Sequence, residues 1–343
     1  MIDILSLNYI ELTEYMKEKG EASYRAEQLF SWLHEKRVSS FSDMSNLSKS
    51  LIAKLEEETY IERITIVKRL ESSDGTLKYL FELSDGNLIE AVALNYHHGV
   101  TVCISSEVGC ARNCSFCASA IGGLVRNLKV SEMLLEVYEI AKNLDKRIAN
   151  VVLMGIGEPF DNFCNVMAFC DIICHEKGMN LSARAITIST CGVLDGIEKL
   201  REGRYKYTLS VSLHSAIDKT RSSLMPINDI YNLKSLKDSC RRYFEETKRR
   251  ITFEYAVIKG VNDSFEDAKA LSGFLSGLSA HVNLIPVNSV SEREYEADKN
   301  SVETFRKYLE TFGINVTVRR TLGQDVNASC GQLRRNTLEN MKE

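Results

Sequence analysis

The sequence predicts an α/β protein with a mainly parallel sheet, and two observations support this fold class. Short apolar runs rich in Val, Ile and Thr recur from about residue 99 onward. Segments with helical spacing of apolar residues separate these runs. Repeated strand–helix units form parallel sheets, and right-handed crossovers allow such a sheet to curl into a full or partial barrel.

Three regions are predicted in chain order. Residues 1–60 are expected to be helical, because apolar positions recur at helical intervals in YRAEQLFSWLHEK and at Leu47, Leu51 and Leu55. Residues 61–98 alternate in short runs around Asp74-Gly75 and Asp85-Gly86, dipeptides typical of hairpin turns, and predict a β-ribbon. Residues 99–343 hold the strand–helix units.

Six strands are predicted in this last region, at 100–105, 149–154, 184–189, 207–213, 251–258 and 281–286. Between the first two lies SEMLLEVYEIAKNL, a predicted helix with Ser131 as its N-cap. Active residues of such barrels sit where strands end.

Composition indicates an ordinary globular protein, with 44% hydrophobic and 26% charged residues among 343. No stretch reaches the roughly 20 apolar residues of a membrane span, and the N-terminus lacks the pattern of a signal peptide. We therefore expect a cytoplasmic protein with no membrane partner. The net charge of −4 argues against a dedicated basic coat for nucleic acid, although local basic faces are compatible with it.

Ten cysteines in a chain of this length are better interpreted as ligands, catalysts or core residues than as disulfides. Half of them lie in apolar or helical contexts and are expected to be buried and inert: Cys164, Cys170, Cys174, Cys191 and Cys240.

Cys110, Cys114 and Cys117 form a cluster of spacing C-x3-C-x2-C. A closed zinc site needs four ligands and a cubane iron–sulfur cluster has four irons, so three thiolates leave one position for another ligand. A zinc loop completed by a distant residue, or plain core packing, remains the alternative.

Polar residues and glycines follow several predicted strands. GIGEP (155–159) follows the second, Ser189 ends the third, Ser212-Leu213-His214 ends the fourth, and Asn288 follows the sixth. Each alone is more often a satisfied capping group. Together they lie on one rim of one barrel.

These motifs resemble a known family. CISSEVGCARNCSFCAS, RNL, GIGEP, ISTCG, SLHS, LMPIND, GVND, HVNLIP and SCGQL are similar to the RlmN/Cfr family of radical S-adenosylmethionine (SAM) RNA methyltransferases. The resemblance spans about residues 24–333. It implies a (β/α)6 partial barrel and a 4Fe-4S cluster on Cys110, Cys114 and Cys117. It also implies that SAM is bound by a set of rim residues: Gly157, Glu158, Ser189, Ser212, Leu213, His214 and Asn288.

The resemblance also assigns three catalytic residues. Cys330 becomes S-methylcysteine by taking the methyl group of one SAM. A 5'-deoxyadenosyl radical from a second SAM then converts this methyl group to a methylene radical. The methylene radical adds to the adenine carbon. Glu90 then accepts the proton of that carbon. Cys103 resolves the covalent adduct and leaves a transient disulfide. Without the resemblance, both cysteines would be interpreted as buried thiols and Glu90 as solvent-facing.

The implied substrates are an adenine of 23S rRNA in the peptidyl-transferase region, and tRNA, with the helical N-terminal region engaging RNA. The implied partners are a reductant such as flavodoxin or ferredoxin, and the chain is expected to be a monomer. Family members methylate adenine at C2 or at C8, and GIGEP and LIPVN favour C2. An iron–sulfur redox protein with a Cys103–Cys330 disulfide is the alternative from another class.

Overall fold

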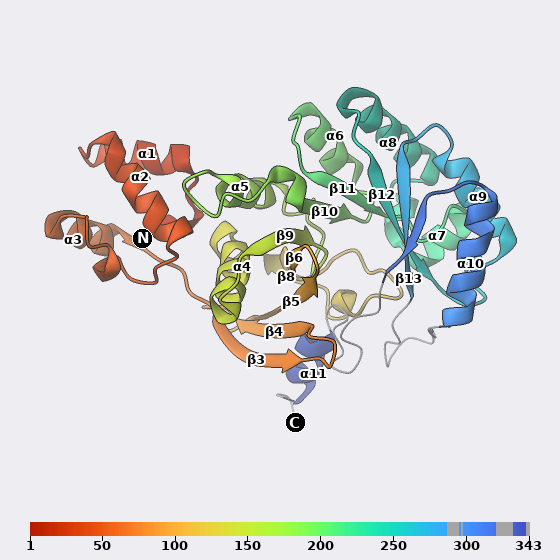
Figure 1. Cartoon of the computed structure of the whole chain (residues 1–343), viewed down its shortest axis with the longest axis horizontal. Coiled ribbons are helices and arrows are strands. Elements are labelled where there is room, and N and C mark those ends of the chain that lie inside the picture. Colours follow the sequence, from red (N-terminus) through yellow and green to blue (C-terminus); the bar gives the residue numbers. More distant parts are fainter. Residues whose placement is uncertain (287–294, 296–297, 320–331, 341–343) are drawn as a thin grey trace.

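The computed structural model describes residues 1–286, 295, 298–319 and 332–340. The N-terminal region is helical and lies at one end of the molecule (Figure 1). Its helices are α1 (Tyr9–Glu18), α2 (Ser23–Phe30), which continues as a π-helical turn, and α3 (Lys49–Glu58). Most of the apolar positions predicted to define these helices are buried, Leu29, Leu51 and Leu55 among them, whereas Trp32 is only partly buried.

One ten-stranded sheet joins the ribbon to the barrel, in the order β14-β13-β12-β11-β10-β9-β6-β5-β4-β3. The ribbon strands are antiparallel: β3 (Thr65–Glu71), β4 (Leu77–Glu82) and β5 (Leu88–Tyr96). The parallel strands are β6 (Gly99–Ile104), β9 (Ile148–Leu153), β10 (Ile186–Thr190), β11 (Thr208–Ser212), β12 (Ile251–Val257), β13 (Ala280–Pro286) and β14 (Val316–Val318).

The six predicted strands and the two predicted hairpins are confirmed, with strand ends within about two residues of those expected. Two features of the sheet were not predicted. Strand β14 extends the parallel part, and β5 pairs with β6 along 92–96 and 99–103, so the ribbon is continuous with the barrel sheet. Strand β14 has only three residues, and the turn at His97-His98 between β5 and β6 lacks the Asp-Gly or Asn-Gly pair that marks a hairpin in sequence.

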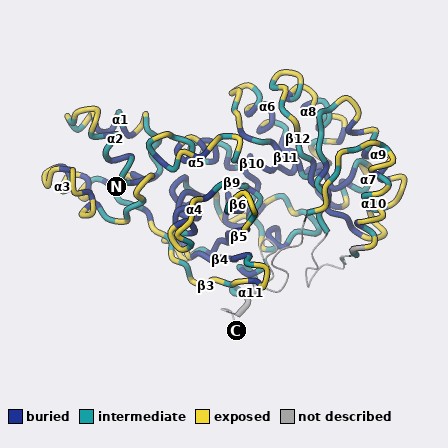
Figure 2. Tube along the Cα trace, viewed as in Figure 1, coloured by how far each residue is buried: buried dark blue, intermediate teal, exposed yellow. Residues whose placement is uncertain are grey.

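Helices cover the outer side of the curved sheet (Figure 1). They are α4 (Val130–Leu144), α5 (Phe163–Cys174), α6 (Leu194–Glu202), α7 (Asp218–Leu224), α8 (Leu233–Thr247), α9 (Phe265–Leu275) and α10 (Lys299–Thr311). Helix α11 (Gln332–Asn340) lies instead beside the ribbon. Figure 2 shows buried chain along the central strands and exposed chain on the outer helices. Among the described residues, no helix is both long and apolar enough to span a membrane.

The prediction that Ser131 caps α4 is wrong. The helix begins one residue earlier, and Glu132 accepts a hydrogen bond from the backbone N–H of Lys129 at 2.8 Å. Ser131 is fully buried, and its hydroxyl donates to Asp3 at 2.5 Å. A tertiary contact with the N-terminus therefore replaces the local cap. The expectation for Cys164 also fails, because this residue is exposed on α5, whereas Cys170, Cys191 and Cys240 are buried.

Candidate active site

A short hairpin closes the base of the cysteine loop. Strands β7 (Glu107–Gly109) and β8 (Leu124–Asn127) pair on either side of it, and the Cys110 N–H donates to Gly123 at 3.1 Å. Within the loop, the Arg112 guanidinium forms a two-pronged ion pair with Asp161, with one contact of 2.6 Å. The loop is therefore held in place by backbone and charged contacts on two sides.

The three loop thiols fit a cationic metal cluster. Burial raises the pKa of Cys110 to about 12, and burial followed by repulsion from Cys117 and Cys110 raises the pKa of Cys114. Three thiolates can share this pocket only if bound metal supplies positive charge. In the part of the chain that the structure describes, no three His, Cys, Asp or Glu side chains converge on a single ion. A cubane cluster does not need such convergence, because each thiolate binds a different iron.

The GIGEP loop packs tightly on the segment that leads into the cysteine loop. The Glu158 carboxylate accepts hydrogen bonds from the N–H groups of Cys191 at 2.7 Å and Phe160 at 3.1 Å. Burial raises its pKa. Gly157 has a φ of 109°, and a Cβ on it would lie 2.6 Å from the Cβ of Glu107. Only glycine fits this conformation and this contact.

Glu107 is a site residue that the sequence did not reveal. It is fully buried, and its Oε2 accepts the Glu158 N–H at 2.8 Å. Its Oε1 has no hydrogen-bond partner among the described residues, and burial raises its pKa to about 7. An unpartnered buried acceptor beside a fixed second carboxylate fits a ligand that carries an ammonium group, such as the amino group of SAM.

The described residues that were predicted at the ends of the third and fourth strands lie there. Ser189 is in β10 and Ser212 ends β11. The buried His214 follows with a φ of 55°, and its Nδ1 accepts the Ala256 N–H at 2.9 Å, so the neutral ring carries its proton on Nε2. Burial lowers the pKa of His214 to about 3. The ring meets that of Phe116 edge-on at 4.7 Å, which brings this rim against the cysteine loop.

Two further residues brace the rim and were not predicted. The buried Arg221 guanidinium donates to the carbonyls of Leu213 at 3.2 Å and Cys191 at 2.7 Å. Asn262, in the GVND motif, donates to the carbonyl of His214 at 2.6 Å. Both side chains are buried, and their hydrogen bonds fix the positions of backbone carbonyls next to the strand ends. A sequence pattern of polar residues in loops does not distinguish this role from exposure to solvent.

Glu90 and Cys103 lie on neighbouring strands and share a cavity. Cys103 on β6 pairs in register with Val92 on β5, and Glu90 is two residues before Val92, so all three side chains point to one face of the sheet. A small cavity is lined by Glu90, Ala91, Val92, Cys103, Gly155 and Ile156. The structure therefore brings the two residues together beside the GIGEP loop.

Glu90 is 3% exposed rather than solvent-facing. Its Oε2 lies 3.1 Å from the Nζ of the fully buried Lys78, and its Oε1 accepts the backbone N–H of Arg334 in α11. Leu333 of the same helix packs on Leu80 and Leu88 of the ribbon. Two predicted site residues, Cys330 and Asn288, lie outside the described residues.

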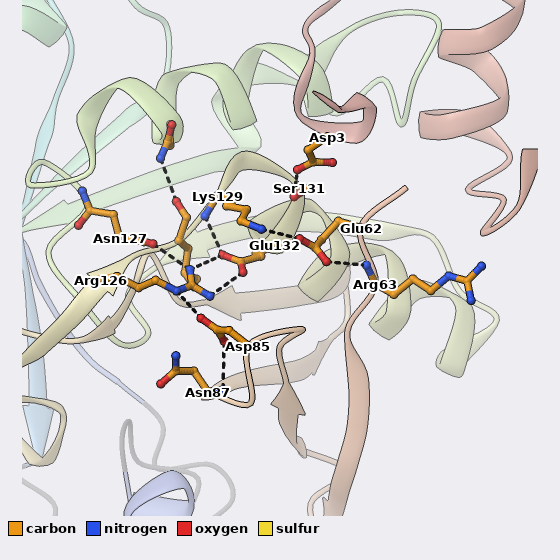
Figure 3. Close-up of polar contacts among 12 residues, drawn as sticks. Asp3, Glu62, Arg63, Asp85, Asn87, Arg126, Asn127, Lys129, Ser131 and Glu132 are labelled. Atoms are coloured by element: carbon orange, nitrogen blue, oxygen red, sulfur yellow. Dashed lines mark hydrogen bonds and ion pairs between the residues drawn. The ribbon is translucent and has the colours of Figure 1, made fainter. Parts of the chain in front are cut away.

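A polar network ties the three regions of the chain together beneath the site (Figure 3). Arg126, in β8, pairs with Asp85 of the ribbon turn at 2.7 Å and with the buried Glu132 of α4 at 2.8 Å. Lys129 pairs with Glu62, just beyond the N-terminal helices, at 2.7 Å. The segment from Arg126 to Ser131 is thus fixed to the ribbon region through Asp85 and Glu62, and to the N-terminal region through the hydrogen bond from Ser131 to Asp3.

Comparisons with known proteins agree with this geometry. Residues 2–61 match the ribosomal RNA large subunit methyltransferase N-terminal domain, and residues 104–271 match the radical SAM superfamily. The chain is 47% identical to the "Probable dual-specificity RNA methyltransferase RlmN" of Lachnospira eligens, covering 100% of this chain and 99% of that protein. A protein of the same name from Clostridium perfringens is 46% identical, with 99% and 98% covered.

A solved structure resembles the whole chain. The crystal structure of a radical SAM methyltransferase from Sphaerobacter thermophilus superposes with a TM-score of 0.92 at 40% identity, covering 97% of this chain and 99% of that one. The barrel and the three-cysteine loop thus define a radical SAM enzyme, a class that uses SAM and a 4Fe-4S cluster. More particularly, the chain belongs to the RlmN family of radical SAM methyltransferases.

Proposed function

We propose that the protein methylates C2 of an adenine in 23S rRNA and in tRNA through a methyl group carried on Cys330. The relatives' name, dual-specificity RNA methyltransferase, supports the substrate class. The observation that supports the chemistry best is the cavity that Glu90 and Cys103 share beside the GIGEP loop. C2 of adenine carries no nucleophilic lone pair, so it cannot displace the methyl group of SAM directly.

In this proposal Cys110, Cys114 and Cys117 hold the cluster, which together with SAM supplies a 5'-deoxyadenosyl radical. The SAM site consists of Gly157, Glu158, Ser189, Ser212, Leu213, His214 and Asn288, with Glu107 added here. Glu158 and Glu107 accept hydrogen bonds from the ammonium group of SAM. The edge-on packing of Phe116 against His214 holds the cysteine loop against the strand-end residues of this site.

The chain's own residues then complete the transfer. A methylene carbon held on the Cys330 sulfur would bond to C2, and the C2 proton would pass to the Glu90 carboxylate. The adduct would also lose one electron to the oxidised cluster, which balances the one electron that cleavage of SAM consumes. The Cys103 thiolate attacks the Cys330 sulfur, and the sulfur–carbon bond breaks with its electron pair on carbon. That carbon takes up a proton and becomes the methyl group. Reducing the resulting disulfide requires two electrons from a reductant such as flavodoxin or ferredoxin.

The test uses the cluster-loaded protein with SAM, a reductant and RNA labelled with deuterium at C2 of adenine. We expect wild-type protein to release 2-methyladenosine with loss of the label. Cys330→Ala should give no product, since the methyl carrier is missing. Cys103→Ala should accumulate a covalent protein–RNA adduct, detected by gel mobility and mass spectrometry. Cys164→Ala is the matched control, because this thiol is exposed on α5, and it should behave as wild type.

A parallel reaction uses RNA labelled with deuterium at C8 of adenine, and loss of that label with retention of the C2 label would show the C8 reaction. Free product released at a normal rate by Cys103→Ala would exclude the resolving role of that thiol. An unmodified Cys330 together with no SAM cleavage would indicate an iron–sulfur redox protein.

A further inference from the structure

The ion pair between Lys78 and Glu90 is unusual for a ribbon strand. Lys78 is fully buried and Glu90 nearly so, and their charged atoms lie 3.1 Å apart. Lysine and glutamate are rarely buried, because each charge loses its hydration. A purely structural ribbon could fill these two positions with apolar residues at no cost in stability.

The register of the sheet places this pair beside the resolving thiol. Lys78 on β4 pairs with Val92 on β5, and Val92 pairs with Cys103 on β6. Paired residues of neighbouring strands point to the same face, so Lys78, Val92 and Cys103 form one row of the sheet. Glu90 lies on the same face, two residues before Val92 on β5. Glu90 and Cys103 line the cavity, whereas Lys78 does not.

Apolar side chains lie on one side of Glu90. Leu80 lies opposite it on β4, and Leu88 and Leu333 complete the apolar cluster on that side. A carboxyl group in such surroundings takes up a proton unless a nearby cation opposes this. A proton acceptor must be ionised before the reaction, so the apolar cluster and the proposed role of Glu90 require a neighbouring positive charge.

We propose that Lys78 is a positioning residue, whose buried ammonium pairs with the Glu90 carboxylate and holds it at the cavity shared with Cys103. This inference rests on the proposed function. Among the residues that the structure describes, the charged groups beside the carboxylate include Lys78 from β4 and Arg334 from α11, and Cys103 from β6 is a titratable group of the cavity. The N–H of Arg334 in the first turn of α11 binds the second oxygen of the carboxylate. Lys78 and α11 therefore orient the group from two sides.

The test compares separate steps of the reaction in the cluster-loaded protein. Lys78→Met keeps the length of the side chain and removes its charge. We expect methylation of Cys330 and cleavage of SAM to proceed at rates within about twofold of wild type, because neither step uses Glu90. Resolution of the protein–RNA adduct should slow at least about tenfold, since loss of a neighbouring cation shifts a carboxyl pKa upward by one unit or more.

A pH profile separates this role from general damage to the fold. The acidic limb of the resolution rate should move to higher pH in Lys78→Met, whereas a merely loosened structure would lower the rate equally at every pH. Lys78→Arg retains the charge and should restore part of the rate. An unshifted limb in Lys78→Met would overturn the inference.

A double variant keeps the test decisive if Lys78→Met does not fold. Lys78→Met/Glu90→Gln leaves no unpaired buried charge. If Lys78 acts only through Glu90, this double variant resolves the adduct as slowly as Glu90→Gln alone. A further tenfold loss in the double variant would contradict the inference. Failure of wild-type protein to form any adduct, or of Cys103→Ala to trap one, would instead contradict the proposed function.

Discussion

Gly157 shows at the scale of one residue how closely the GIGEP loop lies on the chain that precedes the cysteine loop. Its φ of 109° is disfavoured for any residue with a side chain, and an added Cβ would meet the Cβ of Glu107 at 2.6 Å. We expect Gly157→Ala to lower the free energy of unfolding by about 2–4 kcal/mol, through backbone strain and this contact together. Urea unfolding of the cluster-free protein measures the effect.

The matched control is Gly277→Ala. Gly277 has a φ of 83°, and no atom lies within 4 Å of the position of its Cβ. At this position the substitution strains only the backbone, so we expect Gly277→Ala to lower the free energy of unfolding by about 1 kcal/mol. Equal losses at the two positions would show that the contact with Glu107 has no energetic weight.

Single residues also show the limits of prediction from sequence. The cysteines at 110, 114 and 117 could be assigned because their spacing is itself the signal. Lys78 and Glu107 could not be assigned to the site from the sequence, because a lysine on a ribbon strand and a glutamate beside a turn are ordinarily exposed. Their roles depend on which atoms surround them, and those atoms come from segments far away in the sequence.

At the scale of elements, β8 is the strand that ties the cysteine loop to its surroundings, through Arg126. Glu132, one of its partners, is fully buried, while the other, Asp85, is exposed. Arg126→Met leaves the Glu132 carboxylate buried without its ion pair, which costs about 3–5 kcal/mol for a fully buried pair. Because Arg126 is itself 27% exposed, we expect a loss of about 1–3 kcal/mol in unfolding free energy.

Arg306→Met is the control for this prediction. Arg306 also pairs with two carboxylates, Glu303 and Glu310 of α10, but both of these are exposed. Exposed ion pairs contribute at most about 1 kcal/mol. If Arg306→Met destabilises the protein as much as Arg126→Met, burial of Glu132 is not the cause.

The strands of the barrel could be predicted because each is a short apolar run, and this local pattern sets both its conformation and its burial. The N-cap of α4 could not be predicted, because the Ser131 hydroxyl donates a hydrogen bond to Asp3, which is 128 residues away. Likewise, β14 has only three residues, and the β5–β6 pairing joins two predicted regions. Elements and hairpins that carry a local sequence signal were predicted, and contacts without such a signal were not.

At the scale of the whole molecule, the packing of the N-terminal helices on the barrel includes a buried histidine. His34 is fully buried and its Nδ1 lies 3.0 Å from the hydroxyl of Tyr138 in α4. Burial lowers the pKa of His34 from 6.5 to about 3. The neutral ring therefore stabilises the fold fully above pH 6.5, and this contribution is lost as the pH falls from 6.5 towards 3.

We expect the unfolding free energy of cluster-free protein to fall in this range by up to about 1.4 kcal/mol per pH unit from this residue. His34→Gln should flatten the slope, as measured by urea unfolding at pH 7, 6 and 5. His97→Gln, at an exposed position, should leave the slope unchanged. A slope that His34→Gln does not alter would place the acid sensitivity elsewhere, for example at the buried His214.

The continuity of the ribbon with the barrel sheet limits how this enzyme can be altered. Neighbouring strands lie about 4.8 Å apart, so backbone hydrogen bonds fix Lys78 and Cys103, two strands apart, at about 10 Å. Loops at the strand ends can vary in length without changing that spacing. A slip of one residue in β5 would turn Glu90 to the opposite face. The ribbon cannot be transplanted between relatives as an independent unit unless its register with β6 is transplanted too.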